Sequence, residues 1–440
     1  MPDIRFDTDL IRRYDLNVPP YTSYPTPPHF HADFNVLSYR RAALLSNAGL
    51  RALEAEIRLP LCTSPELMPQ YLQCLRREFE LQSELFDPRR PIRQLYVTGN
   101  AMLLGDAAAL QQLLEHFDRY FRLAPAGERG FSIDIDPRTA TAAIVEQFAA
   151  LGFTCANFGI PDLHAAAKPD RTRSLDHMLR LIEAARGCGF KCLGFELIYG
   201  LPQQTRQDLA KLLQAVVAAK PDRLTTYTYP HLPELQAVQG HVRNRPRPSA
   251  ATRLRLRQLA IETLTRAGYV DIGRDCFAWP WDGQAHSRCH TWLDHSRGLA
   301  DAECDLLGLG AGAVSRMGTA YAQNAKRVPD YCASLQRHAL PIECGVELTV
   351  DDVVRREVIQ QIMCQRTLDF SAIGRRYALD FHSYFARELT QLRALADDGL
   401  VIDSDTGFAV SERGHLLLQN ITSVFDAYRH GRHTAPASIT

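Results

Sequence analysis

The chain has 440 residues, of which 46% are apolar and 23% are charged. A chain of this length can bury large cores, and we expect two or three domains. Lys plus Arg equals Asp plus Glu, 50 against 50, so no overall positive field favours nucleic acid or an anionic membrane. The first 20 residues lack the apolar core of a secretion signal, and no stretch is long enough to cross a bilayer. We therefore expect a cytoplasmic protein with neither a nucleic-acid nor a membrane partner.

The 11 cysteines are scattered along the chain, and no two of them form a C-x-x-C pair. An odd number of cysteines in a chain without a secretion signal argues against a disulfide framework. Cys188 and Cys192 are close together in sequence and span a predicted helix end and the following strand. Buried apolar cysteines are the favoured interpretation of this pair, and metal ligands are the alternative.

Between about residues 93 and 318, short apolar runs alternate with amphipathic helices, which favours a parallel sheet covered by helices. The predicted strands mix polar and apolar residues, as expected where one face lines a barrel interior or a cleft. No G-x-G-x-x-G follows a strand, so an α/β fold with a partial β/α barrel is favoured over an open doubly wound sheet. The predicted strands are 92–99, 130–136, 154–160, 191–200, 222–229 and 270–277, and the helices between them are 106–123, 138–153, 174–190, 207–220 and 251–269.

Beyond residue 328 the pattern changes to helices at 349–365 and 382–399, followed by a hairpin at 400–414. Helices followed by a hairpin predict a small winged-helix-like domain. Because this segment is not conspicuously basic, we expect it to pack over the barrel or a substrate rather than to bind nucleic acid. The predicted domains are an N-terminal extension (1–50), a β/α barrel (51–328) and a C-terminal helical domain (329–440).

Seven short motifs, read together in chain order, resemble those of one known family. They are "PPYTSYPT" (19–26), "DIDPR" (134–138), "LIYGLPQQT" (197–205), "PHLP" (230–233), "DLLGLGAGAVS" (305–315), "YAQN" (321–324) and "RREVI" (355–359). In this order the chain resembles the oxygen-independent coproporphyrinogen III oxidase family of radical S-adenosylmethionine enzymes. The resemblance implies a partial barrel with a C-terminal helical domain that acts in haem biosynthesis. It also implies a [4Fe–4S] cluster that cleaves S-adenosylmethionine, and a radical that removes carbon dioxide from two propionates.

The resemblance further implies a C-x-x-x-C-x-x-C loop, because three thiolates must hold three irons of the cluster. Cys62 stands at the first ligand position, but the next two positions fall on Glu66 and Pro69, which supply no thiolate. Cys74 lies further on, in a predicted helix, and Glu56 stands where the family has a tyrosine. Cys62 is thus a remnant ligand position, and the sequence predicts that the cluster site is degenerate.

Two further positions of the implied ligand site are changed. The glycine-rich loop that lets backbone approach the ligand reads "TGNAM" (98–102), in which only Gly99 survives. Pro161 stands where a glutamine is expected. Because three separated positions differ, a degenerate site explains the sequence better than an error in one loop.

Other residues of the implied pocket are kept or exchanged conservatively. Arg173 matches an arginine that would pair with the ligand's carboxylate, although it could equally be a surface residue at a helix start. Asp134 stands in place of a ribose-binding glutamate and Glu196 in place of an aspartate, so a nucleotide site and purely structural carboxylates are both open. Ile198 and Val314 are candidates for apolar ligand contact, with core packing as the favoured alternative.

The segment 275–295 gathers Cys276, His286, Cys289, His290 and His295 among four aromatic residues. These side chains could ligate zinc or haem iron, but their spacing matches no structural zinc pattern. A polar loop with scattered His and Cys is the favoured interpretation. A loop of this kind near the pocket could also contact a tetrapyrrole.

Two hypotheses follow from the sequence. The first is a family member without radical chemistry, which works by binding a tetrapyrrole such as coproporphyrinogen or haem, S-adenosylmethionine, or a protein partner. The second is an active coproporphyrinogen dehydrogenase with an atypically ligated [4Fe–4S] cluster. The missing thiolates favour the first hypothesis.

Overall fold

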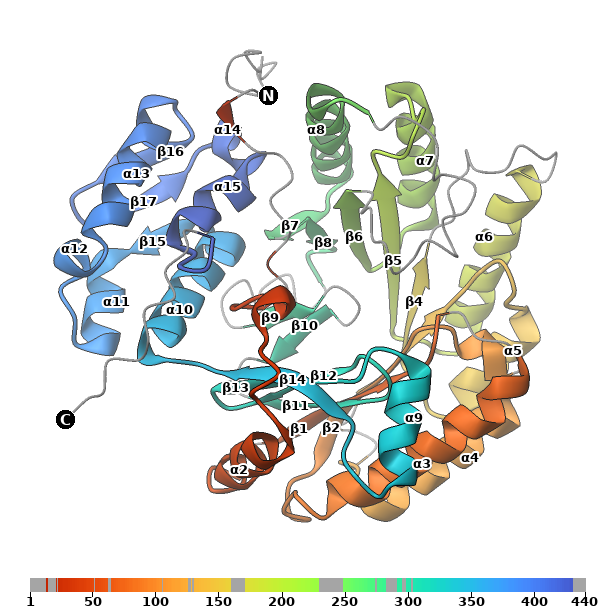
Figure 1. The fold of residues 1–440 in the computed structure, drawn as a ribbon. Coiled ribbons are helices and arrows are strands. Elements are labelled where there is room, and N and C mark those ends of the chain that lie inside the picture. Colours follow the sequence, from red (N-terminus) through yellow and green to blue (C-terminus); the bar gives the residue numbers. More distant parts are fainter. Residues whose placement is uncertain are drawn as a thin grey trace.

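The computed structural model describes residues 13–14, 21, 23–50, 52–61, 65–104, 106–125, 128, 130–159, 171–228, 248–273, 275–281, 291–294, 298–301 and 304–429. A large curved sheet with helices along its outer side forms one part, and a smaller, mainly helical part lies beside it (Figure 1). This arrangement confirms the predicted α/β class and the C-terminal helical region.

Twelve strands form the large sheet, in the order β14-β13-β12-β11-β1-β2-β3-β4-β5-β6-β8-β7. The central strands β11 and β1 to β6 are parallel, and the strands at both ends of the sheet are antiparallel. The two edge strands are not paired with each other in the described structure, so the barrel is partial, as predicted. The strands are β1 (Leu53–Arg58), β2 (Ile92–Thr98), β3 (Gly130–Ile135), β4 (Cys155–Gly159), β5 (Cys192–Tyr199), β6 (Arg223–Thr228), β7 (Val270–Gly273), β8 (Cys276–Ala278), β11 (Asp305–Leu309), β12 (Val314–Met317), β13 (Ala320–Asn324) and β14 (Ile342–Glu347).

Helices connect the parallel strands and cover one face of the sheet (Figure 1). Several begin at a side-chain cap, as at Asp106, Thr141 and Thr205, where a side-chain oxygen accepts a backbone N–H of the first turn. The covering helices and short 3₁₀ turns are η2 (Pro65–Leu67), α3 (Met68–Ser83), η3 (Ala101–Leu104), α4 (Ala107–Tyr120), α5 (Ala142–Ala150), α6 (Arg171–Gly187), α7 (Arg206–Ala219) and α8 (Ala250–Arg266).

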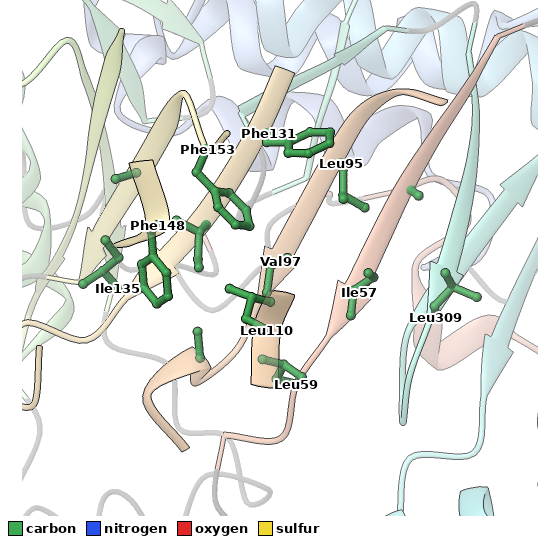
Figure 2. Close-up of a cluster of buried hydrophobic side chains, with 14 of the residues drawn as sticks. Ile57, Leu59, Leu95, Val97, Leu110, Phe131, Ile135, Phe148, Phe153 and Leu309 are labelled. Carbon is green, nitrogen blue, oxygen red and sulfur yellow. The ribbon is translucent and has the colours of Figure 1, made fainter. Parts of the chain in front are cut away.

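The two faces of the central strands differ in polarity because side chains alternate along a strand. Figure 2 shows the outer, apolar face, where Ile57 on β1 and Val97 on β2 lie near Leu110 of α4, and where Phe131 of β3 lies close to Phe153. The alternate positions of the same strands carry polar residues, which point to the inside of the curve. This alternation explains the mixed strand sequences from which the partial barrel was predicted.

The domain boundary expected between residues 328 and 329 would separate one helix and one strand from the barrel part that they pack against. Helix α9 (Val328–Gln336) packs on α3, and β14 pairs with β13. The expected N-terminal unit of residues 1–50 also packs into the barrel, since α2 (Val36–Asn47) contacts β12 and β13. We therefore propose that the second domain begins near residue 348 and that residues 30–50 belong to the first.

The C-terminal part consists of helices around a three-stranded antiparallel sheet of order β15-β17-β16. Its strand, helices and hairpin follow one another as expected for a winged-helix-like domain. Tyr21 and Tyr24, from the start of the chain, are buried in its core. The elements are α10 (Val350–Gln365), β15 (Thr367–Asp369), α11 (Phe370–Tyr377), α12 (Phe381–Tyr384), α13 (Ala386–Asp397), β16 (Val401–Ser404), β17 (Gly407–Val410), α14 (Glu412–His415), α15 (Leu418–Thr422) and η6 (Ser423–Phe425).

Three smaller elements complete the description: η1 (Pro27–His29) and the two-stranded ribbon of β9 (Thr291–Asp294) and β10 (Gly298–Asp301). Among the helices of the described residues, none has the length and apolar character needed to span a membrane.

Candidate functional site

Three carboxylates come from alternate strands of the parallel sheet: Glu56 of β1, Asp134 of β3 and Glu196 of β5. Asp134 accepts hydrogen bonds from the backbone N–H of Gly99 and from Nδ2 of Asn157, both at 3.3 Å. Burial raises the pKa of Asp134 well above its usual value, and the charges of Glu196 and Glu56 raise it further. The structure thus brings Gly99, Asp134 and Glu196 together into one half-buried acidic site inside the barrel.

Glu196 has a partner that sequence reasoning missed. The hydroxyl of Tyr227 on β6 hydrogen-bonds to the Glu196 carboxylate, and burial together with the Glu196 charge raises the tyrosine pKa well above its usual value. The tyrosine therefore stays protonated and acts as a hydrogen-bond donor. This contact depends on the register of β5 and β6, in which Ile198 pairs with Tyr227. No motif in the sequence indicates that register.

Glu56 is buried and has local partners at the end of β1. Its Oε1 accepts a hydrogen bond from Thr98 Oγ1 at 2.7 Å and lies 3.3 Å from Nε of Arg58. The carboxylate is therefore held by its own strand and by the end of β2. Thr98, the first residue of the "TGNAM" segment, therefore anchors this carboxylate.

Gly99 is required by backbone packing. Its φ is +86°, and a Cβ at this position would lie 2.0 Å from the carbonyl oxygen of Leu59. Leu59 also donates its backbone N–H to the carbonyl of Thr98 at 2.9 Å. The close approach of the ends of β1 and β2 is enough to require glycine here, with no ligand involved.

The two apolar candidates lie in different surroundings. Ile198 is 36% exposed and lies two residues beyond Glu196 on the same face of β5, so it is available for contact with a ligand. Val314, at the start of β12, packs against a small cluster that includes Phe30 and Tyr321. Val314 therefore belongs to a packing cluster near the antiparallel end of the sheet that β14 forms.

Several sequence candidates lie outside the described part of the molecule. The group includes Cys62, Pro161 and four residues of the 275–295 segment (His286, Cys289, His290 and His295). Arg173 lies in α6 with its side chain outside the description. Cys276 is buried in β8, where its sulfur is 3.5 Å from Thr225 Oγ1. Within the described part of the chain, no three His, Cys, Asp or Glu side chains are grouped as in a metal site.

Comparisons with known proteins agree with this architecture. Residues 348–417 match the family model of the HemN C-terminal domain. Over 443 residues the chain is 33% identical to the oxygen-independent coproporphyrinogen III oxidase of Pseudomonas aeruginosa, covering 97% of this chain and 96% of that protein. The chain belongs to the oxygen-independent coproporphyrinogen III oxidase family. The protein of the same name from Escherichia coli (strain K12) is 32% identical with the same coverage.

A solved structure extends this family relationship to three dimensions. The coproporphyrinogen III oxidase HemN from Escherichia coli, described as a radical SAM enzyme, matches with a TM-score of 0.86 at 31% identity. The match covers 96% of this chain and 99% of that structure. The family resemblance and the predicted fold are therefore both confirmed.

Against this family background, the thiols near β1 do not fit a cluster held by three cysteines. Cys74 is buried in α3, and its thiol hydrogen-bonds with Cys332 of α9, whose pKa is raised to about 12 by burial and by this contact. Helix α9 packs on α3 within the outer layer of the molecule, so the Cys74 thiol is committed to packing between two helices. Glu66 lies in η2 and Pro69 in the first turn of α3, and neither carries a thiol.

A buried polar network that sequence reasoning missed supports this region. Glu78 of α3 accepts hydrogen bonds from the Gly310 N–H, Asn324 Nδ2 and the Tyr331 hydroxyl, each at 2.7 Å. Burial raises the pKa of Glu78 to about 7, against the opposing effect of these donors. Glu78 stands in the charged run "RREFE", which is typical of an exposed helix surface, so no sequence pattern indicated its burial.

Proposed function

We propose that this protein binds a tetrapyrrole of haem biosynthesis in the polar interior of its partial barrel, without radical chemistry. The observation that carries the proposal is the position of Cys74. It is the first cysteine after Cys62, and its thiol packs against Cys332 between two helices. This position supports a barrel without the three-thiolate cluster of the family at the end of β1, while the family fold is retained over almost the whole chain.

The interior offers groups that suit the ring of a tetrapyrrole. The N–H groups of pyrrole rings are hydrogen-bond donors, and the half-buried carboxyl oxygens of Asp134 and Glu196 are acceptors. Ile198, which is 36% exposed beside Glu196, supplies apolar surface for the macrocycle. Propionate groups of the ligand would be repelled by the Glu196 carboxylate, so we expect them to point away from β5.

The first experiment separates binding from radical catalysis. The full chain is reconstituted anaerobically with iron and sulfide, bound iron is counted, and 5′-deoxyadenosine release from S-adenosylmethionine is measured. In parallel, coproporphyrin III and haem are titrated into the protein as purified and followed by absorbance. We expect saturable porphyrin binding without stoichiometric cluster or 5′-deoxyadenosine. Four irons per chain with turnover would overturn the proposal in favour of an active dehydrogenase.

The second experiment locates the ligand with a matched pair of variants. Ile198→Ala removes exposed apolar surface next to Glu196, and Ile402→Ala removes an isoleucine that is 66% exposed on β16 in the C-terminal part. We expect Ile198→Ala to weaken porphyrin binding several-fold and Ile402→Ala to leave it unchanged, since about 1 kcal/mol of apolar contact is lost only in the first. Equal affinities for the two variants would refute binding inside the barrel.

A further inference from the structure

Two cysteines begin neighbouring strands of the barrel and face each other in the sheet. Cys155 opens β4, Cys192 opens β5, and the two are direct partners in the parallel register. Asn157 and Glu196 lie further along the same strands, on the same face, at the candidate site. The cysteines therefore lie at the opposite end of the barrel interior, where the strands begin. Cys192 is thus paired with a cysteine of β4. Cys188, its neighbour in sequence, lies directly after the end of α6.

The surroundings of Cys155 favour a thiolate. The Cys192 thiol donates a hydrogen bond to the Cys155 sulfur, and Ser132 and Thr154 contribute hydroxyl donors. The guanidinium of Arg223, the first residue of β6, adds a nearby positive charge. Together these groups lower the pKa of Cys155 to about 6, although burial opposes the change. Cys155 therefore ionises at a lower pH than an ordinary cysteine.

We propose that Cys155 and Cys192 form a peroxide-sensitive dithiol that closes reversibly to a disulfide. Directly paired residues on adjacent strands are about 4.8 Å apart, within the range of about 4.4–6.8 Å between Cα atoms that a disulfide spans. Their Cβ atoms project in parallel from one face, so closing the bond must distort the strand ends. A distorted disulfide is more easily reduced, which makes the pair suited to reversible oxidation.

The chemistry balances with hydrogen peroxide as the oxidant. The Cys155 thiolate attacks one peroxide oxygen, the O–O bond breaks, and the departing hydroxide takes a proton to become water. The product is a sulfenic acid on Cys155. The Cys192 sulfur then attacks the Cys155 sulfur, the S–O bond breaks, and the thiol proton of Cys192 leaves with the hydroxyl as a second water. In total the two thiols lose two electrons, and one hydrogen peroxide is reduced to two waters.

The disulfide would tie β4 to β5 below the candidate site. Asn157, which donates a hydrogen bond to Asp134, lies two residues beyond Cys155, and Glu196 lies four residues beyond Cys192. A distortion at the strand starts is thereby transmitted along two strands to these side chains. The inference stands independently of tetrapyrrole binding, because it requires only the paired thiols.

Peptide mapping tests the proposal on the full chain. The reduced protein is treated with hydrogen peroxide, remaining thiols are blocked with N-ethylmaleimide, and tryptic peptides are identified by mass spectrometry. Lys191 separates Cys188 from Cys192, so trypsin places them on different peptides and the bonded cysteine is assigned directly. We expect a linked peptide pair containing Cys155 and Cys192, which dithiothreitol separates. A link through Cys188 instead, or no link, would overturn the proposal.

A reactivity profile provides a second readout that needs no variant. Cys344 is also partly exposed, but burial and the charge of Glu343 raise its pKa. We expect iodoacetamide labelling of Cys155 to level off above about pH 7 and labelling of Cys344 in the same sample to keep rising. Parallel profiles for the two cysteines would overturn the proposal.

Two variants provide the control for peptide mapping. Cys192→Ser should abolish the linked peptide, and Cys188→Ser should leave it unchanged.

Discussion

Replacing Glu78 with glutamine should change how the stability of the protein depends on pH. Glu78 is completely buried in α3 and accepts hydrogen bonds from Gly310, Asn324 and Tyr331. Glutamine has nearly the same shape and keeps one acceptor oxygen, so the variant tests the charge while disturbing the packing little. The network holds the turn after β11, where a Cβ on Gly310 would lie 2.4 Å from the carbonyl oxygen of Arg58 at the end of β1.

The magnitude follows from the pKa of Glu78, which burial raises from 4.5 to about 7. A raised folded-state pKa means that the folded protein binds a proton that the unfolded chain has already released. The stabilisation is therefore complete below pH 4.5 and is lost as the pH rises to 7. At about 1.4 kcal/mol for each tenfold change in the ionisation constant, the loss is about 3 kcal/mol.

Urea denaturation of the wild type and of Glu78→Gln at pH 4.5 and at pH 8 measures this effect. We expect the free energy of unfolding of the wild type, relative to the variant, to fall by about 3 kcal/mol between the two conditions. The comparison between the two proteins cancels the contributions of all other titrating groups. The reasoning is refuted if the difference between them is the same at both pH values.

Three further predictions concern single substitutions, and two of them have a matched control variant. Gly99→Ala should cost about 3 kcal/mol or more of unfolding free energy in urea denaturation, because its Cβ would lie 2.0 Å from a backbone oxygen. The matched Gly152→Ala, at φ +92° with nothing within 4 Å, should cost only about 1 kcal/mol. Asp134→Asn should raise Tm more at pH 8 than at pH 5, because the unfolded chain releases the Asp134 proton that the folded protein retains at its raised pKa, so the wild type loses stability as the pH rises; an equal shift at both pH values would contradict this. Arg257→Gln, which breaks a buried ion pair at 2.6 Å between α8 and the β7–β8 turn, should cost about 3 kcal/mol, and Arg266→Gln, at a pair whose arginine is 73% exposed, less than about 1 kcal/mol. Equal losses for the two arginines would refute the burial argument.

The fold could be predicted from the sequence to the extent that it depends on periodic patterns. The mixed polarity of strands such as β3 and β5 indicated a curved sheet with one polar face, and the structure has that face. The ends of the sheet were harder to predict, because β11 to β14 lie in glycine-rich sequence in which small residues hide the alternation. Gly308, for example, has to lack a side chain because the Val314 backbone lies against it.

The candidate site could be predicted only in part, because its contacts join residues far apart in the chain. Glu56 and Asp134 were identified from their positions relative to family motifs, whereas Tyr227 became visible only through the register of β5 and β6. Gly99 was predicted as the surviving glycine of a ligand loop, and the structure adds a packing reason for it, the neighbouring carbonyl of Leu59. Sequence position indicates that a residue is constrained, and the packing around it shows what constrains it.

The motifs that carry the family resemblance hold the fold together, and this explains how it can persist while the site changes. Asp305 forms a buried ion pair with Arg90 at 2.5 Å. Asn324 donates to Glu78 at 2.7 Å, and Arg355 holds the C-terminal helices through buried hydrogen bonds. Loss of any of these partners would leave a buried charge or polar group unpaired, at a cost of several kcal/mol. Selection on stability alone is therefore enough to keep these motifs, independently of the chemistry that the barrel carries.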